Sequence, residues 1–176
     1  MRKRTRAREY ALQILYQIDI RKEPSEKLIS EFMEAEDAEP EVKDFAEALI
    51  KGAVMNIKKI DEAISKYASN WKLNRMAVID RNVLRLAAYE LLFCEDIPPK
   101  VSINEAVDLA KKFGDMESGK FVNGILDRIK REAVDGILDR INKEKVVNGV
   151  RSKKDKEAIN SIRDKKDKEA INGKAS

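Results

Sequence analysis

Residues 73–95 read LNRMAVIDRNVLRLAAYELLFCE and carry the clearest structural signal in the chain. Their apolar residues recur every three or four positions, which places them on one face of an α-helix. Pro98 and Pro99 follow, and proline ends a helix because it lacks an N–H and clashes with the preceding turn. Other segments repeat the same spacing, and strand-like alternation is nearly absent. The sequence therefore predicts an all-α protein.

Two helices and a longer third are expected before this stretch. Pro24 and Ser25 separate the first helix from the second, since Ser is a favoured N-cap. A single long helix is predicted from Pro40 to Tyr67, where apolar residues keep helical spacing over about seven turns. The core stripe of the first helix consists of Ala7, Ala11, Ile14, Leu15 and Ile18.

Two more helices are expected after it. Ser102 and Glu105 have capping-box spacing for a helix over residues 102–113, and Gly114 suits the position that follows its end. A last helix covers about residues 117–131. Because the connections are short, we expect neighbouring helices to pack antiparallel in bundles.

The first helix carries a second apolar stripe, made of Leu12, Tyr16 and Ile20, roughly opposite the core stripe. A helix that is apolar on both sides is either sandwiched between two bundles or presents one side to a partner. Both readings remain open. Tyr16, which is amphipathic and close to the basic N-terminus, is the residue we assign to a partner.

Composition limits the possible functions. The chain of 176 residues contains no His, which removes the commonest general base and metal ligand, so we expect no enzymatic activity, no metal site and no cofactor. Cys94 is the single cysteine, which excludes an internal disulfide and fits a reducing cytoplasm. No secretory signal and no apolar run of membrane-spanning length is present, so a soluble protein without a membrane partner is expected.

Charge and repetition set the C-terminal third apart. From residue 122 the sequence copies itself with a period near twelve, and residues 130–176 hold 14 Lys and Arg against 9 Asp and Glu. Twelve residues advance a helix by about 120° beyond whole turns, so successive copies cannot dock in the same groove. We predict a helical domain over residues 1–131, and a charged repetitive extension over 132–176 that is helical near its start and disordered beyond.

Three stretches, in this order and spacing, resemble the NusB family of bacterial transcription antitermination factors, and the similarity spans about residues 2–131. They are RTRAREYALQILYQID at 4–19, VLRLAAYELLF at 83–93, and VSINEAVDLAKKFG at 101–114 followed by SGKFVNGILDRI at 118–129.

The resemblance implies a fold and a function. The implied fold is two three-helix bundles joined at an angle. The implied function is binding of boxA RNA together with NusE, a small-subunit ribosomal protein, in a complex loaded onto RNA polymerase for antitermination on ribosomal RNA transcripts.

The N-terminus supports an RNA role independently. Five cations and no anions precede residue 9, and arginine offers planar paired donors to phosphate and can stack on exposed bases. Such contacts give affinity that falls with salt but no choice of sequence. The predicted RNA contacts here are Arg2, Lys3, Arg4, Arg6 and Arg8.

A second RNA surface follows from the resemblance. The family's Lys-Phe pair matches Lys120 and Phe121, where the ring could stack on a base and Lys120 and Asn123 could add polar contacts. Core packing is the alternative role for Phe121. Gly119, before this pair, departs from the family pattern and is expected to loosen the loop that holds Lys120.

The acidic middle of the chain suits a basic ribosomal protein. The resemblance places Asn74, Asp80 and Glu117 around the NusE and RNA surfaces, and the alternative for each is a solvated helix face. The family often has an acid where this chain has Asn74, which weakens any contact there.

Two other functions remain open. NusB-like bundles also form the RNA-binding part of some ribosomal RNA cytosine methyltransferases, but here only a charged repeat follows residue 131, without the Gly-rich turn and catalytic Cys of such enzymes. A helical protein-interaction module without an RNA role is the other alternative, and the basic N-terminus argues against it.

Overall fold

The computed structural model describes residues 2–148, with the side chains of residues 2–133 and 135–136. This part contains helices and no strand, so the predicted all-α class is confirmed. The helices are α1 (Lys3–Arg21), α2 (Ser25–Ala35), α3 (Pro40–Met55), α4 (Ile57–Tyr67), the 3₁₀ turn η1 (Leu73–Arg75), α5 (Val78–Phe93), α6 (Pro99–Phe113) and α7 (Ser118–Asn148).

The chain divides into two compact units, Met1–Ala133 and Val134–Ser176. The last helix, expected to end near residue 131, continues to Asn148. The predicted disorder of the later repeats concerns residues 149–176, which lie outside the described residues.

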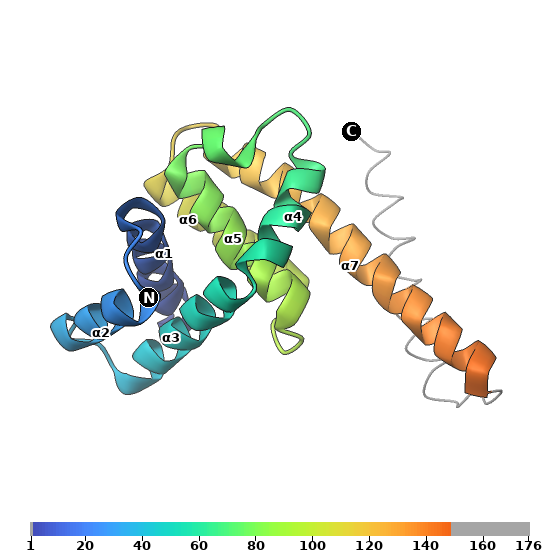
Figure 1. Ribbon diagram of the computed structural model, residues 1–176, viewed down its shortest axis with the longest axis horizontal. Helices are drawn as coiled ribbons and strands as arrows, with labels where there is room; N and C mark the ends of the chain where they lie inside the picture. Colours follow the sequence, from blue (N-terminus) through green and yellow to red (C-terminus); the bar gives the residue numbers. More distant parts are fainter. Residues whose placement is uncertain (1, 149–176) are drawn as a thin grey trace. The chain divides into compact units, whose positions relative to one another are not determined.

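Helix α5 is the centre of the first unit. Figure 1 shows α1, α2 and α3 on one side of it and α4 on the other. Its buried residues Val83, Leu84 and Ala88 share one apolar core with Leu49 and Ile50 of α3. The same core takes Ile60 and Ile64 from α4, Ala106, Leu109 and Ala110 from α6, and Val122, Ile125, Leu126 and Ile129 from α7.

The first three helices form one bundle, in which α1 and α3 pack most closely. Tyr10 and Phe32 meet edge to face, with ring centroids 5.0 Å apart, and a small satellite core adds Ala7, Val42 and Ala46. Helices α4, α5 and α6, with the N-terminal part of α7, form the second group. The predicted pair of helical bundles is thus confirmed.

The prediction of a single long helix from Pro40 to Tyr67 is wrong in one respect, because the helix is interrupted at Asn56. That residue has φ −107° and ψ 14°, and its side-chain amide donates to the Gly52 carbonyl at 2.9 Å. Gly52 also faces Tyr89 so closely that a Cβ there would lie 2.0 Å from the Tyr89 Cζ. Both halves pack on α5, and this packing overrides the continuous apolar pattern.

The predicted start of the helix over residues 102–113 is also corrected. Helix α6 begins at Pro99, because proline is favoured in the first turn where no N–H is needed. Ser102 is therefore inside the helix and buried, and its hydroxyl donates to Glu90 at 2.6 Å instead of capping. Gly114 has φ −95°, so it is not a left-handed cap. It is needed because a Cβ would lie 2.5 Å from the Ser118 Oγ.

Candidate nucleic-acid interface

The basic N-terminus is ordered on the first turns of α1. Arg2 is the N-cap residue, and the side chains of Arg2, Arg4 and Arg6 are exposed. The Arg6 Nε donates to the Tyr10 hydroxyl at 2.9 Å, and the Arg4 guanidinium lies 5.0 Å from the Phe45 ring centroid. These contacts orient the two cations, while the outer N–H groups of Arg6 find no partner among the described side chains. They are therefore available to an anion.

Lys3 differs from its neighbours because it is already neutralised. Its ammonium group lies 2.7 Å from Glu39 and 2.9 Å from Glu41, at the end of the α2–α3 connection and the start of α3. Hydrogen bonds to Glu39 and Glu41, and then their charges, raise the pKa of Lys3 above its ordinary value. A phosphate at Lys3 would have to displace two carboxylates.

Arg8 is not on the surface at all, and this corrects its assignment to the RNA contacts. Its side chain is 3% exposed, and its guanidinium donates to both Glu90 oxygens, at 2.7 Å and 2.9 Å. Arg8 shares a face of α1 with Leu12 and Leu15, which are both buried. We therefore no longer assign it an RNA contact.

The second predicted cluster lies on the first turns of α7. Lys120 is exposed, with its ammonium group 3.6 Å from Glu117, and the exposed Asn123 donates to Asp127 at 3.3 Å. Phe121 is half-buried and packs on the core, which is the role expected as the alternative to base stacking. Gly119 is buried inside the helix and not in a loop, and the aliphatic chain of Lys111 lies against it. It therefore does not loosen the backbone at Lys120.

Trp71 is a residue that sequence reasoning missed. Its indole is 56% exposed and meets the Phe121 ring at a centroid distance of 6.0 Å and an interplanar angle of 76°. The available signal was a lone Trp in the polar stretch SNWKLNR at 69–75.

Helix α6 connects the two clusters. The Thr5 hydroxyl donates to Glu105 at 3.0 Å, and Lys112 pairs with Glu9 at 2.6 Å, so α6 runs alongside the N-terminal half of α1. Lys111, which covers Gly119, lies six residues after Glu105, or about 9 Å along the helix axis. The N-terminal cations and the start of α7 are thus held at a fixed offset.

A groove opens beside these clusters, between α1, α5 and α6. Its volume is about 330 Å³, and its lining is mostly apolar. Leu12 is buried, whereas Tyr16 and Ile20 are 38% and 52% exposed, so the outer part of the second α1 stripe is free of the protein's own core. The lining residues are Leu12, Gln13, Tyr16, Gln17, Ile79 and Phe113.

The other predicted partner contacts occupy different environments. Asn74 on η1 and Glu117 before α7 are exposed, whereas Asp80 is 7% exposed at the start of α5. Burial raises the pKa of Asp80, the charge of Asp115 raises it further, and the Ser118 hydroxyl partly opposes both. One Asp80 oxygen has no hydrogen-bond partner among the described residues. Asp80 is therefore a buried carboxyl and not a surface charge that steers a partner, which corrects its predicted role.

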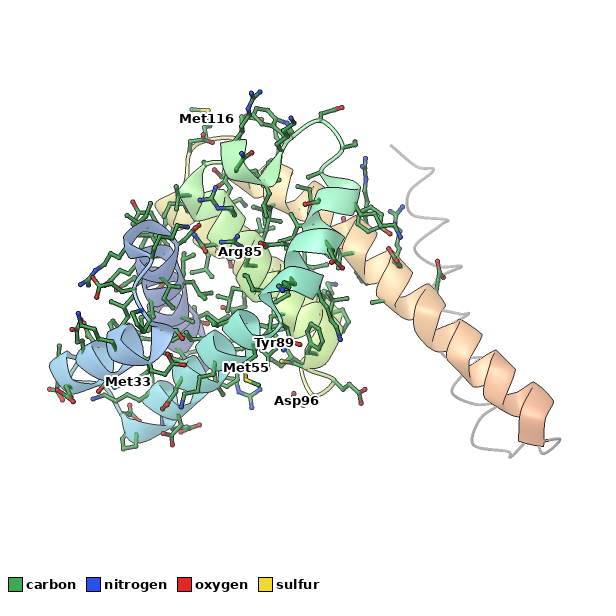
Figure 2. All side chains as sticks on the ribbon, in the orientation of Figure 1. Met33, Met55, Arg85, Tyr89, Asp96 and Met116 are labelled. Atoms are coloured by element: carbon green, nitrogen blue, oxygen red, sulfur yellow. The ribbon has the colours of Figure 1, made fainter. Side chains whose placement is uncertain are left out.

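An ionic network fixes α1 beneath the groove. Asp19, one turn beyond Tyr16, accepts hydrogen bonds from Arg81 at 2.8 Å and Asn82 at 3.0 Å. Arg85, in the middle of the helices in Figure 2, joins Asp19 of α1 to Asp61 of α4. Burial alone would raise the pKa of Asp19, but hydrogen bonds from Arg81, Lys22 and Asn82 and the charge of Arg85 lower it to about 2. The network holds α1 and α5, two of the helices that line the groove, and joins them to α4.

A sequence model described as the NusB family matches residues 5–131. The chain belongs to the NusB family. The match covers Arg6 of the N-terminal cluster, the cluster on α7, the groove and the ionic network, which all lie in the first unit. The resemblance found in the sequence is therefore confirmed.

The alignments with relatives from this family cover most of each relative's length. A transcription antitermination protein NusB from Anaeromyxobacter dehalogenans is 52% identical over 128 residues, which are 72% of this chain and 89% of the relative. Such relatives are named as transcription proteins and not as enzymes. No described helix is long and apolar enough to cross a membrane.

Solved NusB structures share the fold. The structure of T. maritima NusB has 47% identity and a TM-score of 0.69, over 73% of this chain and 91% of that one. NusB in a solved complex of the antitermination factors NusB and NusE with dsRNA has 35% identity and a TM-score of 0.69, over 75% of this chain and 98% of that one.

Proposed function

We propose that this chain is an antitermination factor that binds boxA-type single-stranded RNA together with NusE and acts on ribosomal RNA transcription. The observation that carries the proposal is the fixed arrangement of two groups of exposed cations along α1, α6 and α7, one of which adjoins an aromatic ring. Lys120 and Phe121 provide one cluster, and Arg2, Arg4 and Arg6 provide the other.

Single strands suit these clusters better than a duplex. The half-buried Phe121 ring can stack only on an unpaired base, and exposed cations meet the phosphates on either side. Phosphate contacts alone would bind any RNA, so sequence choice must come from the α7 cluster and from the second protein. Lys3 and Arg8 contribute little to this surface, because each is already paired with carboxylates.

The groove at Tyr16 is the proposed NusE site. Its floor is apolar, Tyr16 and Phe113 provide aromatic anchors, and aromatic side chains in such pockets often dominate binding energy. Asn74 and Glu117 remain proposed contacts, with Glu117 as the exposed acid that faces a basic protein. The relative solved with both NusE and RNA supports this pairing.

The remaining assignments follow from this role. The assembly would be loaded onto RNA polymerase in the cytoplasm, and residues 1–131 would carry recognition of RNA and NusE. The charged extension over 132–176 would add only nonspecific attraction to RNA.

Titration of a labelled boxA RNA with the protein, in the presence and absence of NusE, tests the proposal. A scrambled RNA of the same length is the control. We expect NusE to increase affinity for boxA RNA selectively. Equal affinity for both RNAs when NusE is present would refute specific recognition.

A further inference from the structure

Trp71 presents an aromatic surface that the function proposed above does not use. It is the only tryptophan of the chain, and its indole is 56% exposed. Its backbone N–H donates to the Ala68 carbonyl at 2.8 Å, which fixes the main chain between α4 and η1. A large ring is therefore held in place while more than half of it faces solvent.

Phe121 supports this ring from the side. Phe121 packs against the core and meets Trp71 nearly at right angles, with a centroid distance of 6.0 Å. Edge-to-face contact is a favoured geometry, and it orients the second ring without covering it as a stacked partner would. The two rings form a corner, in which Phe121 is the anchored part and Trp71 the accessible part.

Exposed cations adjoin the two rings in the sequence. Lys72 and Arg75 follow Trp71 on exposed positions, and neither side chain has a hydrogen bond or ion pair among the described residues. Lys120 is exposed beside Phe121. Aromatic rings interleaved with exposed cations are typical of surfaces that bind single-stranded nucleic acid. Charge complementarity therefore favours RNA over an apolar protein segment as the occupant.

We propose that Trp71 is a base-stacking residue, whose exposed indole receives an unpaired RNA base while Phe121 holds the indole in position. Lys72, Arg75 and Lys120 contact the adjoining phosphates. The inference rests on the RNA binding proposed above and extends the α7 cluster onto η1. Phe121 becomes a positioning residue for the ring that does most of the stacking.

Fluorescence can test this directly, because one tryptophan supplies the indole emission. A single-stranded boxA-type RNA should change the emission of the full chain in parallel with binding, and a duplex of the same length should leave it almost unchanged. Affinity for the single strand, measured by anisotropy of labelled RNA, should fall about 5- to 100-fold in W71A, since stacking on one base is typically worth that much. W71F should retain most of the affinity because it keeps an aromatic face.

Met55 offers a matched control. It is 83% exposed and is separated from Trp71 by the whole of α4, about 16 Å of helix. In Figure 2 it lies near Tyr89, at the end of α3. M55A should bind RNA like the unaltered protein, and the melting temperatures of all three variants identify any loss of folding.

The outcomes separate this inference from the proposed function. RNA binding with no change in emission and no loss in W71A would overturn the role of Trp71 alone. W71A that binds RNA normally but loses NusE would make the corner a protein contact and overturn the inference too. No RNA binding by the unaltered chain, with or without NusE, would overturn both.

Discussion

Arg8 of α1 and Glu90 of α5 form a paired ionic contact inside the protein, with Nε–Oε1 and Nη2–Oε2 distances of 2.7 Å and 2.9 Å. Both side chains are at most 3% exposed. Ser102 of α6 donates to the same carboxylate at 2.6 Å. A cation from the basic N-terminal run thus links three helices and stabilises the fold instead of binding an anion.

Replacing Arg8 should therefore lower the free energy of unfolding. R8A leaves the Glu90 carboxylate buried without its cation, and breaking a buried pair in this way costs about 3–5 kcal/mol. Urea denaturation followed by circular dichroism measures the loss. The double variant R8M/E90L should recover much of it, because neither charge remains. The control is R6A, whose exposed side chain should change stability by less than about 0.5 kcal/mol; equal effects of R6A and R8A would contradict the assignment.

The exposed arginines should act on RNA and not on folding. In R2A/R6A the affinity for single-stranded RNA should fall, and the slope of log affinity against log salt should decrease by about 1.4, or about 0.7 for each lost phosphate contact. K3A is the matched comparison and should change the slope much less, because Glu39 and Glu41 already neutralise Lys3. If K3A lowers the slope as much as R2A/R6A does, the pairing of Lys3 with Glu39 and Glu41 must break when RNA binds.

Replacing Tyr16 should weaken binding of NusE. Y16A removes a 38% exposed ring from the groove, so affinity for NusE should fall by about 1–3 kcal/mol, as for aromatic anchors at other interfaces. Calorimetric titration measures this, with M55A as a control, because Met55 is exposed at the end of α3 and does not line the groove. A stability loss near 3 kcal/mol with unchanged NusE affinity would instead make Tyr16 part of the core.

Asp80 should destabilise the protein at neutral pH. Burial and then Asp115 raise its pKa in the folded state, so the protonated form is favoured there. Protonation of Asp80 therefore favours the folded state. This contribution to stability is complete below the ordinary pKa of Asp and is lost as pH rises through the higher pKa of the folded state. D80N should thus raise the free energy of unfolding by about 1 kcal/mol at pH 7 and by much less near pH 3. The pH dependence of urea denaturation gives the measurement, and D80N less stable than the original at pH 7 would refute it.

Periodicity predicted the helical class and the buried positions Ala7, Ala11, Ile14 and Leu15 of α1, because burial and helical spacing are locally coupled. It missed the burial of Tyr10 and Leu12, and the two bundles were implied by the family resemblance. It did not reveal that Arg8 is buried, since its partner Glu90 is 82 residues away. The position itself carried a signal: Arg8, Leu12 and Leu15 are spaced i, i+4, i+7, which is one helix face. Because Arg8 is one of five cations in the first eight residues, it was grouped with the exposed ones and this spacing was not used.

Other differences came from competing local rules. Ser102 indicated a helix start and Pro99 only the end of the preceding helix, but α6 begins at Pro99, and Glu90 provides the Ser102 hydroxyl with a buried acceptor. The break at Asn56 depends on the packing of α3 and α4 against α5, which no local pattern contains. The role of Trp71 likewise could not be predicted locally, because it depends on contact with Phe121, fifty residues later in the chain.

The central position of α5 also affects synthesis of the chain. Leu49 and Ile50 of α3 are covered in part by Val83 and Leu84, so the first three helices lack a complete core until residues 78–93 have left the ribosome. During that interval the growing chain exposes an apolar surface that native folding later removes, and such surfaces attract chaperones and favour aggregation. We therefore expect the N-terminal bundle to become protease-resistant only once α5 is available to it.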